Sequence, residues 1–483
     1  MGSTFAGLEL SRRALSAQQS ALNVTGHNIS NSNTQGYTRQ IANLTTTTPD
    51  MIPAMGRNLS LGSGVTLDTI TRARDSFVDR QFRTETSKQQ YWVAKQDSLT
   101  KVEDMINEPS DDSLSNDMNQ FWVAWSDLSK SPDNSGARSV VKERALTLTD
   151  SLHALSTQIS DRQNDLNSQV NVQITQINGY AEQIKDLNDQ IKRAEVAGDN
   201  PNDLRDSRDN LVDELSKIVS VHVIETRDPN FTDRQVNFFR VDIGNETTPQ
   251  TLVDDDKLNK LEGVTAQSGI GGNDITTVQW VGGSALDLGQ KTGTLQANIE
   301  TRDTYLTELQ AKYDKLASGI VTAVNELHND GTATGIDFFD ATSVTASTIS
   351  LGFSDINDIV TGLGATGDGS IATKISSLST GWSSLSATTQ LANKADYGTS
   401  LGDYYGSNVA QLGVDVQQAN RMKAGEDVLL TNVTNQRESL SGVSLDEEMT
   451  NLIKFQKSYS AAARMVTMMD DMLSTLMGMG VTR

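Results

Sequence analysis

Cysteine is absent from this sequence of 483 residues. The chain therefore has no disulfide framework, no thiolate catalyst and no cysteine-ligated metal. Aromatic residues are also scarce, at 5%, and hydrophobic residues make up only 36%. A chain of this length has room for roughly two to four domains. It can bury hydrophobic cores, but these will contain few large apolar side chains. Much of the rest of the sequence is Ser, Thr, Asn and Gln.

Positive charge and long apolar runs are missing as well. The sequence carries 40 Lys and Arg against 62 Asp and Glu, a net charge of −22. This balance argues against nucleic acid or an anionic membrane as the main partner. No run of about 18 apolar residues is present, which excludes a membrane-spanning helix. The N-terminus lacks the basic-then-apolar pattern of a cleaved secretory signal, so we expect a protein that is cytoplasmic or exported without one.

No catalytic or metal-binding pattern stands out. The four histidines have no metal-ligand spacing; they are His27, His153, His222 and His328. The residues Gly289 to Thr292 resemble part of a phosphate loop, but their spacing does not match that motif, so a turn is the better interpretation. Asp254 to Asp256 lacks the alternating ligands of a calcium loop, which favours a solvated turn. We therefore expect no enzyme activity, no cofactor and no bound metal.

The first helix has a narrow apolar stripe. Leu8, Leu15, Leu22 and Ile29 are seven residues apart, and the residues between them are mostly small or polar. Such a stripe is typical of a coiled-coil seam and is too narrow for the face of a helix on a globular core. The run ends in an Asn- and Ser-rich stretch at Gly36, which can adopt the left-handed turn. This helix needs a partner.

The last helix supplies a matching stripe. Its seven-residue row consists of Leu445, Leu452, Tyr459, Val466 and Leu473. A second row contains Phe455, Ala462, Met469 and Leu476. The nearby methionines favour an adaptable packing face over a soft metal site. We expect the two ends to pair, to be loose in the free subunit and to become ordered on assembly. The sequence leaves open whether the interior helices pack within one monomer.

The predicted fold is mainly α with β-rich insertions. Helical spacing runs from about Val140 to Ala197. At 1.5 Å per residue this helix would be about 85 Å long, which is too long for a compact domain, so we expect a rod. Period-two runs and glycines predict strands elsewhere. The predicted parts are a terminal coiled-coil segment (1–35 and 441–483), a long-helix bundle core (36–218, 291–330 and 401–440), a β-rich outer domain (219–290) and a second β-containing outer domain (331–400).

Several stretches resemble a known family. The run from Asn23 to Gln40, which contains Asn-Ile-Ser-Asn and Gly-Tyr-Thr-Arg-Gln, is similar to the signature of bacterial flagellar axial proteins of the rod, hook and hook-associated group. Ser30 and Gln35 stand where the group more often has Ala and Pro. The stretch from Ser441 to Tyr459 resembles the other end of the same group. Internal stretches resemble the hook-associated protein 1 family; they are Glu108 to Asp111 with Phe121-Trp122, Asn202 to Asp209, and Gly335 to Phe339.

The resemblance implies a structural subunit of the junction between flagellar hook and filament, outside the cell. It implies type III export without a cleaved signal, self-association into a ring, and contact with hook protein and with the second junction protein or filament. Leu8, Leu15, Leu22 and Ile29 would pack with Leu445, Leu452, Tyr459, Val466 and Leu473 in the assembly. A cytoplasmic export chaperone would cover Phe455, Met469 and Leu476.

Two alternatives remain open. The first is another flagellar axial protein, such as the hook, rod or filament-side junction protein. The second is an adhesin or hydrolase on a helical stalk, which would need a clustered site in the β-rich insertions.

Overall fold

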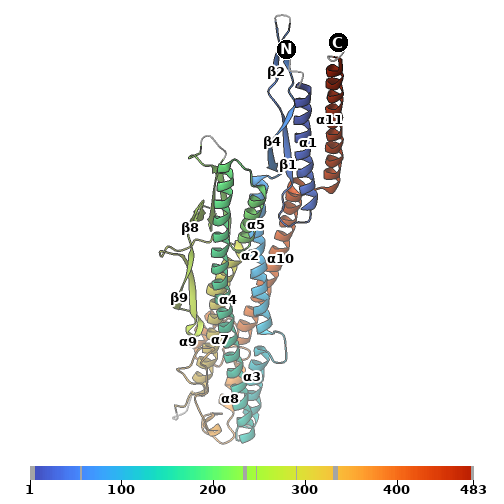
Figure 1. Cartoon of the computed structure of the whole chain (residues 1–483). Coiled ribbons are helices and arrows are strands. Elements are labelled where there is room, and N and C mark those ends of the chain that lie inside the picture. Colours follow the sequence, from blue (N-terminus) through green and yellow to red (C-terminus); the bar gives the residue numbers. More distant parts are fainter. Residues whose placement is uncertain are drawn as a thin grey trace. The chain divides into compact units, whose positions relative to one another are not determined.

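A computed structural model describes residues 6–54, 57–231, 236–245, 247–289, 291–329 and 335–479; the side chains at 50, 52–54, 57–59, 476 and 479 lie outside this description. The chain is mostly helical with small antiparallel sheets (Figure 1). It divides into two compact units. Unit 1 comprises 1–86, 178–260 and 428–483, and unit 2 comprises 87–177 and 261–427. The two ends of the sequence thus fold into the same unit.

Unit 1 contains the terminal helices and most of the strands. Its elements are α1 (Ala6–Ser30), β1 (Gln40–Thr46), β2 (Asp50–Ala54), β3 (Arg57–Leu61), β4 (Val65–Arg72), α5 (Asn202–Ile218), β5 (Val221–Arg227), β6 (Asn237–Ile243), β7 (Gln250–Asp254), β8 (Lys257–Leu258) and α11 (Leu445–Met479). Strand β1 pairs with β4 through a bulge at Asn43 and Leu44, and β2 pairs with β3. The order of the third sheet is β5-β6-β7-β8. Strand-like runs from Arg39 to Leu44 and from Leu59 to Ile70 predict strands in this part of the sequence, and β1, β3 and β4 confirm them.

Three long helices contribute residues to both units. They are α2 (Ser76–Ile106), α4 (Ser135–Ala197) and α10 (Leu401–Ser441). Helix α4 has 63 residues, which at 1.5 Å per residue is roughly 95 Å of helix. The predicted rod is confirmed, and it begins five residues before Val140.

Unit 2 combines helices with one two-stranded sheet. Its remaining elements are α3 (Leu114–Lys130), β9 (Leu261–Gln267), η1 (Ile270–Gly272), β10 (Asp274–Trp280), α6 (Gly293–Glu300), η2 (Thr301–Tyr305), α7 (Leu306–His328), η3 (Ile356–Asp358), α8 (Ser370–Ser377) and α9 (Ala387–Tyr397). Helix α3 begins at a Ser113 cap whose side chain accepts a hydrogen bond from the Asn116 amide. Such a cap satisfies one of the donors that every helix start leaves open.

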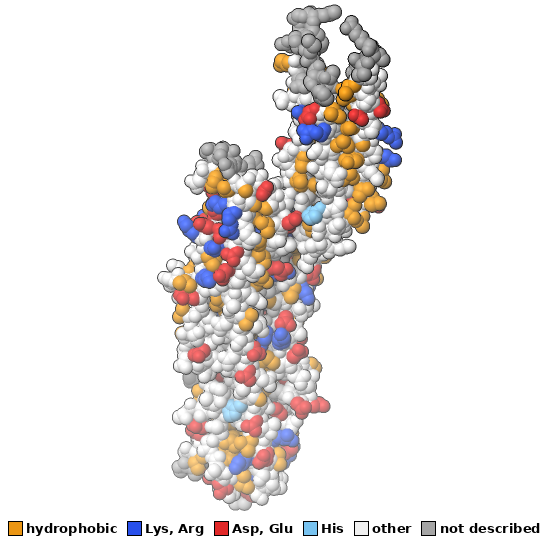
Figure 2. All heavy atoms as spheres, in the orientation of Figure 1, with side chains coloured by type: hydrophobic (Ala, Val, Ile, Leu, Met, Phe, Trp, Pro, Cys, Tyr) orange, Lys and Arg blue, Asp and Glu red, His pale blue; other side chains and the backbone are white. Residues whose placement is uncertain are grey.

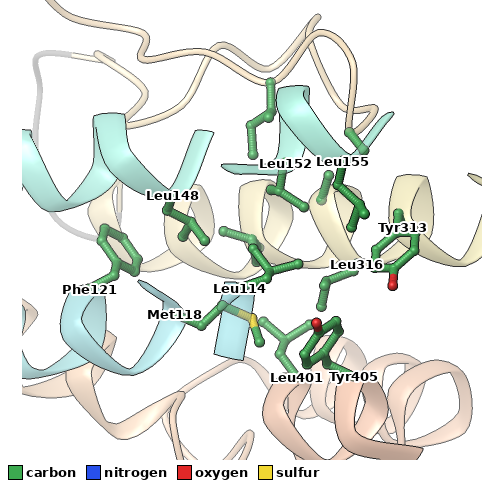
Figure 3. Packing of buried hydrophobic residues seen from close by; sticks show 14 of the residues in the cluster. Leu114, Met118, Phe121, Leu148, Leu152, Leu155, Tyr313, Leu316, Leu401 and Tyr405 are labelled. Atoms are coloured by element: carbon green, nitrogen blue, oxygen red, sulfur yellow. The ribbon is translucent and has the colours of Figure 1, made fainter. Parts of the chain in front are cut away.

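The hydrophobic core of unit 2 lies where α3, α4, α7 and α10 meet (Figure 3). Side chains spaced three and four residues apart point inward from each helix, as the periodicity predicts. Phe121 and Trp125 of α3 are fully buried and contact Phe338, with ring centroids 6.0 and 5.1 Å from its ring. Asn325 holds the adjacent Phe339 by two hydrogen bonds to its backbone, of 2.7 and 2.9 Å. The Gly335 to Phe339 stretch thus anchors a loop in the core.

One predicted helix contains an interruption. Spacing predicts continuous helix from Leu295 to Leu327, whereas a π-helical turn, η2, separates α6 from α7. Arg302 in this turn is 1% exposed, and its guanidinium donates to the Asn167 side chain at 2.8 Å and to the Thr276 carbonyl at 2.9 Å. The wide turn therefore places a charged side chain against β10. Apolar spacing cannot reveal such a turn, because the buried residue that sets it is polar.

The second predicted β-containing domain is wrong in its strand content. The described residues between 335 and 400 form η3, α8 and α9, with a single isolated bridge between Phe339 and Leu351. Glycine, serine and threonine made this segment look strand-prone. Its large apolar residues instead pack onto the helical core of unit 2, where Ile349 and Ile371 are fully buried.

The turn predicted at Asp254 to Asp256 is present, but its middle residue is not solvated. Asp255 is 6% exposed and adopts a φ of 57°. Its carboxylate lies 2.5 Å from Lys192 Nζ, and its carbonyl accepts from Asn188 at 3.0 Å. The acidic run therefore fastens this turn to α4.

In the described residues, no helix is both long and apolar enough to cross a membrane. Within the same residues, no group of three His, Asp or Glu side chains is arranged to hold a metal ion. The turn expected around Gly289 is confirmed by left-handed backbone at Gly289 and Lys291, directly before α6.

Candidate assembly interface

Helices α1 and α11 lie side by side in unit 1 (Figure 1). Near the start of α1, Gly7 lies against the side chain of Met469, so closely that a Cβ there would collide with the methionine methyl. Near the end of α1, Asn28 donates to Glu448 at 3.1 Å. Both contacts lie 21 residues apart on each helix (28 − 7 and 469 − 448). The helices therefore run antiparallel in one continuous register.

The buried face of α1 consists of small and polar residues. They are Ser11, Ala17, Ala21, Val24, Thr25 and Asn28. The predicted seam residues occupy the neighbouring row and are only half-buried; they are Leu8, Leu15, Leu22 and Ile29. Helix α1 packs against β1 and β4 as well as α11, so its buried residues face more than one neighbour. The part of the seam residues in contacts between subunits stays a prediction.

The residues of the rows predicted on α11 are likewise half-buried or exposed. Leu452, Tyr459, Val466 and Leu473 are half-buried, and so are Phe455 and Met469. Leu445 is 50% exposed, and the side chain of Leu476 lies outside the described residues. A further apolar row faces solvent on this helix, with exposures of 40 to 55% (Figure 2); it consists of Met449, Ile453, Met465, Met468 and Met472. The terminal pair thus keeps a large apolar surface open.

Asn28 joins three segments at the end of α1. Its amide nitrogen donates to the Gln40 carbonyl at 2.9 Å and to Glu448 at 3.1 Å. Its amide oxygen accepts from Tyr37 Oη at 2.7 Å and from the Gln40 amide at 2.9 Å. All four hydrogen-bonding positions of the side chain are thereby used. This one residue fastens α1 to β1 and to the first turn of α11.

Charged and aromatic groups complete this junction. Arg39 donates to Glu448 at 2.9 Å and to Glu447 at 2.7 Å, and the Glu448 side chain is only 2% exposed. Tyr37 also contacts His27, with Oη 3.0 Å from Nδ1. Burial and the neighbouring carboxylates raise the pKa of Tyr37, so its hydroxyl remains a donor. The motif residues therefore form one connected polar network.

Helix α5 holds the same junction from the other side. The Thr38 amide donates to Asp206 at 2.9 Å, and the Gln40 side chain donates to Asp203 at 2.8 Å. Gly36 has a φ of 76° and lies directly against Asn210, so that a Cβ would have no room. The left-handed conformation predicted for Gly36 is confirmed. The close approach to α5 is a second reason for glycine at this position.

Apolar periodicity could not identify this polar network. Asn28 and Gly36 were expected only to end a helix, and Glu448 had no expected role. The available signal was the concentration of Asn, Tyr and Arg side chains between Asn28 and Gln40, which exceeds what a surface turn requires. It gives no indication of the partner, because Glu448 lies 420 residues away in the sequence.

Comparisons with known proteins agree with this architecture. The model of the flagellar hook-associated protein FlgK helical domain matches residues 99–339. Models of the flagella basal body rod protein and of the C-terminal part of the flagellar basal body rod FlgEFG proteins match residues 8–38 and 435–479. These two short matches fall on α1 with its turn and on α11 with the end of α10.

Two curated relatives and one solved structure extend the likeness over the chain. The flagellar hook-associated protein 1 of Bacillus subtilis is 33% identical, with 100% of this chain and 99% of the relative covered. That of Escherichia coli is 26% identical, with 94% and 95% covered. The flagellar hook junction protein FlgK of Burkholderia pseudomallei shares the fold, with a TM-score of 0.60 at 14% identity over 75% of this chain and 100% of that one.

The similarity to the Bacillus relative extends over both chains almost entirely, and the helical-domain model lies on the segment that carries the internal motifs. The chain therefore belongs to the flagellar hook-associated protein 1 family, whose members are structural proteins of the flagellum and not enzymes.

Proposed function

We propose that this chain is a structural subunit of the bacterial hook–filament junction that polymerises through its paired terminal helices. The observation that carries the proposal is the division of side chains on α1 and α11. The buried residues of α1 are small or polar, whereas the row that contains Leu15 stays half-buried and the row that contains Met465 is exposed. Exposed apolar rows of this kind are expected to be buried by neighbouring subunits.

In this proposal the assembled subunits form a ring, with the terminal pairs as a coiled-coil inner layer. Hook protein and the second junction protein or filament contact the ring at its two ends. The similarity over the whole length of a flagellar hook-associated protein 1 supports these partners. The subunit reaches its place by type III export, and the absence of cysteine suits a chain that travels unfolded.

The export chaperone is proposed to cover the row of Phe455, Met469 and Leu476. Since Met469 lies against Gly7 in the folded pair, a chaperone on this row and helix α1 would compete for the same surface. Chaperone binding would then keep the terminal pair open until export. A chain whose α1 is deleted should bind the chaperone at least as tightly as the full chain, which can be measured by calorimetry.

A charge placed in the half-exposed row tests the assembly role. Leu15→Asp should leave secretion of the subunit intact but prevent filament attachment, because an unpaired charge in an apolar contact is costly. Ser16→Asp adds the same charge at the next, exposed position and serves as the control. Normal swimming of the Leu15→Asp strain, with the variant present at the hook tip, would refute the proposed contact.

Deletion of the whole gene tests whether the protein is needed at the junction between hook and filament. Cells should form hooks while filament subunits accumulate in the medium. Filaments of normal length on the deletion strain would overturn the junction role, whatever the result for Leu15→Asp.

A further inference from the structure

A cavity of about 550 Å³ opens in unit 1 between the start of α2, helix α5 and strand β5. This volume is within the range of ligand-binding pockets, about 300 to 1,000 Å³. Its lining consists of Thr71, Arg72, Arg74, Ser76, Asp79, Arg80, Arg83, Asn200, Asn202, Arg205, Asp209, Val221, Val223, Ile224, Glu225 and Phe239. None of the interactions derived above for assembly uses this cavity.

The lining is rich in arginine although the chain as a whole is acidic. Five arginines face three carboxylates in it. Asp209 lies 2.7 Å from Arg72, 3.0 Å from Arg74 and 3.3 Å from Arg83. Burial alone would raise the pKa of Asp209, but the attraction of these arginines outweighs it and holds the pKa below the ordinary value. Asp206 and Asp213, outside the lining, pair with Arg72 and Arg83.

Donor capacity remains after these ion pairs are formed. Arg74 Nη2 and Arg205 Nε are buried and have no hydrogen-bond partner among the described residues. Arg80 is exposed and forms no ion pair with any described side chain. The carboxylate of Glu225 is already paired with Arg208 at 3.1 Å. The two buried nitrogens are not accessible from the cavity, so Arg80 is the donor of the lining that an incoming oxyanion can reach.

Strand β5 forms one wall of the cavity and is also the edge of its sheet. Among the described strands it pairs only with β6, so its second edge has no strand partner. Val223 and Ile224 of this strand line the cavity, and Ile224 is 43% exposed. An open edge offers backbone donors and acceptors to an added strand. The arginines and the edge strand thus present two different kinds of binding group to the same space.

We propose that this cavity binds an extended acidic segment of another protein chain. The segment would add to the edge of β5, with valine-like side chains against Val223 and Ile224. Its carboxylates would meet Arg80, the exposed arginine of the lining. Guanidinium and carboxylate groups match in geometry and charge, so such contacts favour carboxylate over neutral amides. This site is separate from the terminal helices and does not depend on their role.

The test uses the full-length protein and a short fluorescent peptide of alternating Val and Glu. Anisotropy should show saturable binding that weakens with salt. The same peptide with Gln in place of Glu, and one with Pro at its centre, should both bind far less. Arg80→Gln should weaken binding roughly threefold to fivefold, as expected for one solvent-exposed ion pair. Arg193→Gln changes an exposed arginine of α4 outside the cavity and should leave affinity unchanged.

Equal binding of the Glu and Gln peptides would overturn the role of the arginines, and unaltered affinity in Arg80→Gln would do the same. Tight binding of the Pro peptide would overturn the strand addition. If succinate or inorganic phosphate displaces the peptide at equal concentration, the cavity binds small anions and the proposed partner is wrong. Because Arg80 is exposed and unpaired, its substitution leaves folding intact, which circular dichroism can check.

Discussion

The core of unit 2 and the terminal pair of unit 1 use their large side chains in opposite ways. In unit 2, Trp125 and Phe338 are fully buried and belong to the core formed by the helices. In the terminal pair, Gly7 lies against Met469, the buried residues of α1 are small or polar, and its predicted seam leucines stay half-buried. A buried aromatic stabilises the chain that carries it, whereas an exposed leucine stabilises only an assembly that covers it. The first region is therefore complete in one chain, and the second would be completed only by the proposed assembly.

Polar side chains also have different roles in unit 2 and in the terminal pair. In unit 2, polar contacts such as Asn325 with Phe339 position a loop on an apolar core. In the terminal pair, the network around Asn28 and Glu448 provides much of the connection itself. A hydrogen bond contributes about 1 kcal/mol net, far less than a buried aromatic side chain. The terminal pair should therefore open at lower cost than unit 2 unfolds.

The largest effect should come from removing an aromatic side chain from unit 2. Phe338→Ala leaves a cavity beside Phe121 and Trp125 and should lower the free energy of unfolding by about 3 to 5 kcal/mol. Val123→Ala on α3, at a side chain 53% exposed, should change it by no more than about 0.5 kcal/mol. Urea denaturation followed by circular dichroism measures both. Equal effects would mean that the aromatic cluster does not hold unit 2 together.

Acid should weaken the same core through His328. The side chain is fully buried, with Nδ1 3.0 Å from the Ile336 carbonyl and Nε2 accepting from the Val360 amide at 2.9 Å. Burial lowers the pKa of His328 to about 4, from an ordinary value of 6.5. As the pH falls below 6.5, the unfolded chain binds the proton first. The contribution is thus complete above this pH and is lost towards pH 4, by at most about 3 kcal/mol.

The variant His328→Gln isolates this effect from the titration of other groups. Its amide can still donate and accept, but it binds no proton. The difference in unfolding free energy between the two proteins should therefore shrink steadily from pH 7 to pH 4. A difference that stays constant over this range would show that His328 does not titrate in the way its contacts imply.

The terminal pair should respond to the loss of its polar centre. Asn28→Ala removes four hydrogen bonds and leaves the Gln40 amide and Glu448 without that partner, a local cost of about 1 to 3 kcal/mol. Hydrogen exchange should accelerate in α1 and α11 but not in α3. Asn23→Ala, at an exposed asparagine whose side chain accepts a hydrogen bond from Gln19, is the matched control. If hydrogen exchange of α1 were unchanged in Asn28→Ala, the network around Asn28 would not stabilise the terminal pair.

The smallest expected effect tests how weak α1 is by itself. A Cβ on Gly26 would meet no atom within 4 Å, so Gly26→Ala should stabilise the helix by about 0.5 to 1 kcal/mol through lower backbone entropy in the unfolded chain. Gly7→Ala should give no such gain, because its Cβ would displace Met469. Hydrogen exchange of α1 distinguishes the two. Equal gains from both variants would argue against close contact at Gly7.

Much of the helical fold follows from the sequence because apolar spacing is set by the helix itself. The long helix to Ala197 was accessible in this way. The segment from Gly335 to Ser400 was not, since its composition indicates strands while its apolar residues pack on helices contributed by distant parts of the chain. Similarly, Arg302 is held by Asn167 and Thr276, and no local pattern relates these three residues.

The assembly interface could be predicted only in outline. Spacing correctly identified two amphipathic ends that pack together, but it did not single out the most buried residues of α1, among them Ala17 and Ala21. Apolar residues were weighted by size, whereas close helix approach selects for small ones. The polar partners of Asn28 depend on tertiary placement of Glu448 and β1. No regularity along the sequence contains that information.

The contact between Asn28 and Glu448 has a consequence for the order of events in a growing structure. It closes a loop of 420 residues, and the entropic cost of closing a loop increases with its length. Folding of the intervening segments shortens this effective loop, so the terminal pair should close last. In the export proposed above, an α1 that reaches the growing tip first would wait for α11. Closure of the pair would thus report that the entire chain has arrived.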